Sequence, residues 1–320
     1  MREAVFIKQN TGRWKQYETE PAKNPDELAE RFIQLTDDLA FSRTFYPASQ
    51  TTDYLNALTA KMHQAIYKNK KEKKNRFILF WKYELPFLFK QYHRQLFFSF
   101  LIFAGSCFIG ALSAAYDDTF VRLILGDGYV NQTLQNIRNG DPMAVYKSAG
   151  ETEMFFSITI NNIYVSFLAF VSGVFLSLGT FLALFRNGIM LGAFQYFFYQ
   201  QGVLTESLLS IWIHGALEIS AIVIAGCGGF VMGNSILFPK TYSRMESFKK
   251  GAKDGLKIAI GLVPIFITAG FLESFVTRHT EMPLWLSLFI ILFSFGFILF
   301  YFIFYPLMLH ARNKDAQPVN

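Results

Sequence analysis

Ionisable side chains lie inside apolar segments of this chain, where they could do chemistry. His214 and Glu218 are four residues apart in an otherwise uncharged stretch, so a helix would place both on one face. Ionisable groups in a membrane interior are costly and are functional candidates by default. The other polar candidates in or beside apolar segments are Asn161, Asn162, Asn187 and Glu273.

Three interpretations of these residues compete. His214, Glu218 and Glu273 could bind a zinc ion and leave an open position for water, although the second histidine of an H-E-x-x-H helix is missing. They could instead form a proton- or ligand-responsive site in a transporter cavity. The third interpretation is a structural hydrogen-bond network with the asparagines. Counting helix rise places His214, Glu218, Glu273 and Asn162 in the outer half of the membrane, and Asn187 at its inner edge.

The segments that must position these residues are apolar and long. The chain has 320 residues, of which 52% are hydrophobic and only 17% are charged, against about 25% charged in a soluble domain. About 20 apolar residues in a helix cross the bilayer core. Runs of this kind predict an all-α, polytopic helical membrane protein with about six transmembrane helices, at residues 96–116, 154–185, 188–199, 208–238, 256–276 and 284–309.

Charge sets the predicted orientation. Ten Lys and Arg residues lie in 61–94 and six in 240–257, whereas 117–153 holds six acidic and three basic residues. Basic flanks favour the cytoplasmic side, so both termini are expected inside and 117–153 outside. This orientation requires a crossing at 188–199, which is short and is either a thin span or part of a broken helix. Because the basic clusters adjoin apolar runs, no nucleic-acid partner is expected.

The predicted domains follow from these patterns. Residues 1–75 form a cytoplasmic helical bundle, 95–310 form the transmembrane domain with the outer loop 117–153, and 311–320 form a cytoplasmic tail. The aromatic and basic segment 76–94 is expected to be an interfacial amphipathic helix, with a core helix of the bundle as the alternative.

Small residues predict close helix packing. Gly188 and Gly192, and Gly229 and Gly233, are spaced by four residues and let helices approach closely, within the chain or in a homodimer. Neither cysteine, Cys107 or Cys227, has a redox or metal pattern around it.

The chain resembles the stage II sporulation protein M family of integral membrane proteins, in its longer form with an N-terminal helical cytoplasmic region. The motifs in order are Asn161-Asn162, Asn187-Gly188, His214-Gly215-Ala216-Leu217-Glu218, a glycine-rich stretch at 226–233, and Glu273. In the N-terminal region the matching residues include Trp14, Asp38 and Tyr46-Pro47.

This resemblance implies a compartment and a class of function. It implies a multi-pass protein of the bacterial inner (cytoplasmic) membrane that anchors or organises an envelope-associated, peptidoglycan-remodelling-like complex with membrane or envelope protein partners. The leading hypothesis is a non-enzymatic scaffold without catalytic residues or a cofactor. The alternatives are a transporter or channel-like protein that uses the polar cluster and an intramembrane metalloenzyme that holds zinc there.

Overall fold

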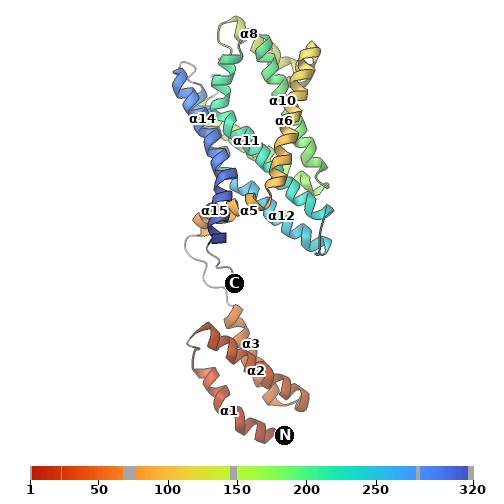
Figure 1. Cartoon of the computed structure of the whole chain (residues 1–320), viewed down its shortest axis with the longest axis vertical. Helices are drawn as coiled ribbons and strands as arrows, with labels where there is room; N and C mark the ends of the chain where they lie inside the picture. The colour runs from red at the N-terminus through yellow and green to blue at the C-terminus, as the bar shows by residue number, and fades with distance from the viewer. Residues whose placement is uncertain (1, 23, 68–75, 145–149, 279–281, 316–320) are drawn as a thin grey trace. The chain divides into compact units, whose positions relative to one another are not determined.

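The computed structural model describes residues 2–22, 24–67, 76–144, 150–278 and 282–315 (Figure 1). Over these residues the chain is helical and contains no strand, so the predicted all-α class is confirmed. The helices form two compact units, Met1–Arg76 and Phe77–Asn320, called here the N-terminal unit and the membrane unit.

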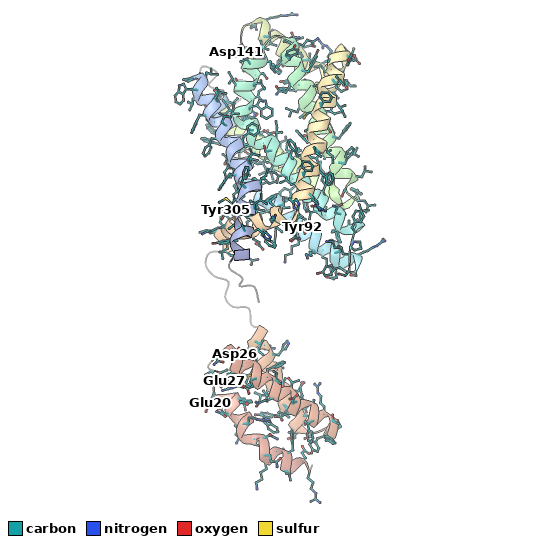
Figure 2. All side chains as sticks on the ribbon, viewed as in Figure 1. Glu20, Asp26, Glu27, Tyr92, Asp141 and Tyr305 are labelled. Carbon is teal, nitrogen blue, oxygen red and sulfur yellow. The ribbon has the colours of Figure 1, made fainter. Side chains whose placement is uncertain are left out.

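The N-terminal unit consists of α1 (Glu3–Thr19), α2 (Pro25–Phe45) and α3 (Gln50–Tyr67). Asn24 begins α2, because its side chain accepts a 2.7 Å hydrogen bond from the backbone N–H of Glu27. Arg31 joins α2 to the end of α1 by donating to the Glu20 carbonyl at 2.7 Å and to the Glu27 carboxylate at 2.5 Å; Glu20 and Glu27 are labelled in Figure 2. The unit has a hydrophobic core of its own, made of Phe6, Trp14, Leu35, Leu39, Leu55, Leu58 and Met62.

The membrane unit contains, among the described residues, six helical segments that are long and apolar enough to cross a membrane. This number agrees with the prediction. Large apolar side chains such as Phe98 and Phe293 are exposed on them, as lipid-facing side chains would be. The segments are His93–Tyr116 (α6), Glu151–Val174 (α9, Glu151–Val171, and η3, Ser172–Val174), Leu178–Gln200 (α10), Leu204–Leu237 (α11), Arg244–Thr277, and Leu284–Ala311.

Two of these segments are composite. The fifth consists of α12 (Arg244–Gly261), α13 (Val263–Phe271) and the π-helix η4 (Leu272–Thr277). The sixth consists of α14 (Leu284–Leu299), the π-helix η5 (Phe300–Phe304) and the first part of α15 (Tyr305–Asp315). In Figure 1, α5, α12 and α15 lie at one end of the unit, called here the basic end, and α8 lies at the other, the acidic end.

The predicted boundaries of the second and third spans are wrong. The run 154–185 is not one helix, because the chain turns at Leu176 and Ser177, which have positive φ angles of 53° and 70°. The third span is therefore α10, with 23 residues, and 188–199 is its second half and not a thin or broken crossing. Arg186 lies within α10 and does not mark the end of a span. The turn escaped prediction because its residues are nearly all apolar.

The two charged segments expected as loops are largely helical. The basic segment 240–257 mostly belongs to α12, which Ser243 begins by accepting from the backbone N–H of Glu246 at 3.3 Å. The acidic segment 117–153 contains α7 (Asp118–Leu125) and α8 (Asp127–Arg138). Val121 and Val130 from these two helices are buried with Phe197 and Phe198 of α10. The acidic end of the membrane unit is thus capped by packed structure.

The spaced glycines bring helices together within the chain. A Cβ at Gly188 would lie 2.6 Å from Ser106 Cβ, and one at Gly192 would overlap the Cys107 carbonyl, so both glycines face α6. A Cβ at Gly229 or Gly233 would overlap the Thr180 or Ser177 side chain respectively. The intramolecular alternative accounts for all four glycines.

The segment 76–94 forms α4 (Arg76–Leu79), the π-helix η1 (Phe80–Glu84), α5 (Leu85–Gln91) and the start of α6. Leu85 and Phe89 are fully buried in the core of the membrane unit, whereas Phe77 and Phe87 are exposed. An interfacial position for the exposed aromatic face stays a prediction.

The elbow formed by α4, η1 and α5 is bonded to the end of the last span. The Tyr301 hydroxyl donates to the Trp81 carbonyl at 2.5 Å, and the Tyr305 hydroxyl (labelled in Figure 2) donates to the Lys82 carbonyl at 3.0 Å. Between these segments lies an open apolar groove of about 430 Å³, lined by Phe77, Ile78, Trp81, Lys82, Phe300, Tyr301 and Tyr305.

Candidate functional site

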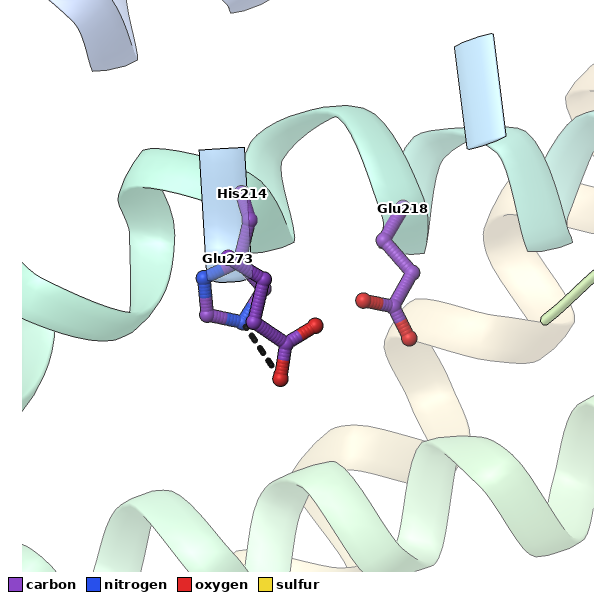
Figure 3. Close-up of side chains that lie close together, drawn as sticks. All are labelled: His214, Glu218 and Glu273. Carbon is purple, nitrogen blue, oxygen red and sulfur yellow. Dashed lines mark ion pairs between the residues drawn. The ribbon is translucent and has the colours of Figure 1, made fainter. Parts of the chain in front are cut away.

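The intramembrane site is a cluster of three side chains, His214, Glu218 and Glu273, shown in Figure 3. His214 and Glu218 lie one turn apart on α11, and Glu273 comes from η4. One ligand atom from each residue lies within 4.8 Å of the other two. The exposed fraction is 5% for the His214 side chain and 13% for that of Glu273, so the cluster is largely withdrawn from the surface.

His214 is oriented by a threonine on η4. Its Nδ1 atom lies 3.0 Å from the Thr277 hydroxyl, which itself donates a 3.2 Å hydrogen bond to the Leu272 carbonyl. A hydroxyl has one hydrogen to donate, so it must accept from His214. The assigned tautomer therefore carries its proton on Nδ1, and the acceptor nitrogen Nε2 is directed at the carboxylates. Nε2 lies 3.8 Å from Oε1 of Glu273, the pair joined by the dashed line in Figure 3.

Glu218 is oriented by Asn162 of α9, whose side-chain amide donates a hydrogen bond to the carboxylate. Asn162 is buried, and α9 approaches α13 closely because Gly270 has no side chain to meet Thr159. Three segments far apart in the sequence thus supply the cluster and its hydrogen-bonding partners. The π-helix η4 presents both Glu273 and Thr277 to His214, and π-helical turns occur frequently at functional sites.

The structure does not place every predicted residue in the cluster. Asn161 is exposed, on a different face of α9 from Asn162. Asn187 lies in the interior of α10, where its side chain donates to the Ala183 carbonyl at 2.8 Å. Its predicted location at the inner edge of the membrane is wrong, since it depended on a span that ended at Arg186.

One residue of the site, Thr277, and one neighbouring ion pair were missed from the sequence. Thr277 was overlooked because a threonine at the end of an apolar run is unremarkable, although it stands four residues after Glu273. Arg278 pairs with Glu151 at 3.0 Å and so joins the end of the fifth span to the start of α9. The pair could have been predicted, because an acidic and a basic residue lie at the ends of two apolar runs.

The fold and the buried cluster define a polytopic helical membrane protein. The family model described as Stage II sporulation protein M matches residues 99–278, which is more than half of the chain and includes the whole cluster. The chain belongs to this family. Residues 4–68, which make up most of the N-terminal unit, match a second family model described as a domain of unknown function, DUF8413. No curated protein and no solved structure matches the chain.

Proposed function

We propose that this protein is a non-enzymatic scaffold of the cell envelope. In this proposal it lies in the bacterial cytoplasmic membrane with both termini and the basic end in the cytoplasm. The N-terminal unit binds partners on that side, and the helices α7 and α8 bind partners on the outer side.

The observation that carries the proposal is the modular construction of the chain. The N-terminal unit has its own core and its own family match, separate from those of the membrane unit. A membrane-embedded body attached to a separately packed module suits a protein that holds others in place. The basic residues of α12 at one end, and acidic residues such as Asp127 at the other, support the orientation.

Photo-crosslinking in living cells tests the scaffold. A photoreactive residue would replace Ile33 of α2, which is 60% exposed, or Leu123 of α7, which is 79% exposed, in the full-length protein. Phe293 of α14, 67% exposed on a span, is the matched control. We expect discrete adducts with different envelope proteins from the first two positions and lipid adducts from the third. Adducts confined to lipid or to the chain itself at all three positions would contradict the proposal.

Thiol labelling tests the orientation. In a background without Cys107 and Cys227, a cysteine at Leu123 should react with a membrane-impermeant reagent added to intact cells. A cysteine at Met245 of α12, 61% exposed, should react after the membrane is opened. The reverse labelling pattern would show that the proposed orientation is wrong. The scaffold hypothesis would then be judged by the crosslinking experiment alone.

A further inference from the structure

We propose that His214, Glu218 and Glu273 bind one divalent transition-metal ion inside the membrane unit. One imidazole nitrogen and two carboxylates converge from α11 and η4, with their ligand atoms within 4.8 Å of one another. A histidine nitrogen with carboxylate oxygens suits zinc and neighbouring first-row ions better than calcium or magnesium, which prefer all-oxygen sites. The inference is independent of the scaffold hypothesis.

The hydrogen bonding of His214 prepares it to bind a cation. Its Nδ1–H is directed to the Thr277 hydroxyl, so the lone pair of Nε2 points toward Glu273 and Glu218. Histidines that bind metals almost always donate their other ring N–H in this way, which fixes the tautomer and the ring orientation. The bond from Asn162 to Glu218 gives a carboxylate ligand the same kind of support.

The separation of the side chains also fits a shared ion. The 3.8 Å between Nε2 of His214 and Oε1 of Glu273 is longer than a hydrogen bond. Two ligands that each bind zinc at about 2.0–2.2 Å in a tetrahedral arrangement lie roughly 3.4 Å apart. Small side-chain movements would close the cluster around an ion. Three protein ligands would leave a fourth position open for water or a ligand.

Charge balance favours an ion at this location. Two ionised carboxylates so close together repel each other, and a membrane interior screens that repulsion poorly. A divalent cation with two carboxylates and a neutral imidazole gives a net charge of zero. Bound protons are the competing way to neutralise the carboxylates, and they would require no metal.

Metal analysis of the full-length protein tests this inference. The protein would be purified in detergent without chelators, measured for zinc, stripped, and reloaded with Zn²⁺ or Co²⁺ alone. We expect one ion per chain and a Co²⁺ absorption spectrum of the low-coordinate type. Glu218→Gln and Glu273→Gln should each weaken binding at least tenfold, and Thr277→Val should weaken it about 10–100-fold.

A matched control separates the site from nonspecific binding. Glu206→Gln removes an exposed carboxylate from the same helix, α11, and should leave the affinity and the stoichiometry unchanged. Size-exclusion profiles identify variants that fail to fold. The metal content of the wild-type protein tests the inference even if every variant fails to fold. Wild-type protein that binds neither Zn²⁺ nor Co²⁺ stoichiometrically would overturn the inference and favour bound protons. An equal loss of metal affinity in Glu206→Gln and Glu218→Gln would also overturn the inference.

Discussion

The hydroxyl of Thr277 lies 3.0 Å from Nδ1 of His214, and this contact joins the fifth span to the fourth across 63 positions of sequence. It orients the imidazole ring on α11. Both residues are buried, and the exposed fraction of the whole residue is 1% for Thr277 and 4% for His214, so water cannot readily replace the bond.

Thr277→Val should therefore destabilise the membrane unit. Valine keeps the shape of threonine but leaves the buried N–H of His214 without this acceptor, which costs about 1–3 kcal/mol. Thermal unfolding of the detergent-solubilised protein measures the loss. Thr277→Ser restores the hydroxyl and should recover most of it. Equal melting temperatures for the valine variant and the wild type would show that the bond contributes little.

Gly192→Ala should weaken the packing of α10 on α6. A methyl group there would overlap the Cys107 carbonyl, and backbone must move to admit it, at a cost of about 1–3 kcal/mol. Gly105→Ala on α6 is the control, because no heavy atom lies within 4 Å of its added carbon. Alanine should be neutral or slightly stabilising at that position. The melting temperature of Gly192→Ala should therefore be lower than that of Gly105→Ala. The reverse order would contradict the close contact between α10 and α6.

Asp38 should be essential to the N-terminal unit. Its Oδ2 accepts from Arg13 at 2.5 Å and from the Trp14 indole N–H at 2.7 Å, which fixes α1 on α2. Asp38→Ala should cost about 1.5–3 kcal/mol, since both bonds involve a charged acceptor. Hydrogen exchange of α1 in the full-length protein should rise accordingly. Asp37→Ala, an exposed neighbour, should leave exchange unchanged, and a similar rise in both variants would exclude the proposed role.

Asp117 should make α7 sensitive to acid. The Thr119 side chain and backbone N–H both donate to its carboxylate, and they lower its pKa below the ordinary 3.8. Because the folded-state pKa is depressed, the stabilisation is present above about pH 3.8 and is lost as pH falls through the folded value. Hydrogen exchange in α7 should increase over that window.

The control for this pH effect is Asp117→Asn. Asparagine also caps helices but does not titrate, so exchange in α7 should be nearly independent of pH over the same window. An identical acid response in both proteins would assign the effect to another group.

Much of the fold could be predicted from composition, because membrane spans require long apolar runs and basic flanks. Six spans follow from that rule alone. The turn at Leu176 and Ser177 could not be predicted in this way, since hydropathy does not distinguish an apolar turn from an apolar helix. That one turn moved Arg186 and Asn187 from a span boundary into the interior of α10.

The candidate site was predictable in part for a similar reason. Helical spacing places His214 and Glu218 together, and depth in the membrane makes Glu273 and Asn162 reachable. The role of Thr277 depends on the π-helix η4 and on the rotation of the fifth span against α11. Both are properties of tertiary packing. Threonine is neither charged nor strongly apolar, so the sequence pattern does not indicate that Thr277 faces His214.

The bonds from Tyr301 and Tyr305 to the carbonyls of Trp81 and Lys82 have a structural consequence. They join the first residues of the membrane unit to its last span, so the two ends of this unit's chain are hydrogen-bonded to each other. Followed along the chain from Phe77, these two hydrogen bonds come first, then the buried Leu85 and Phe89, and only then the first span. The elbow is therefore an anchored part of the membrane unit, held by hydrogen bonds and by core packing, and not a free lead into α6.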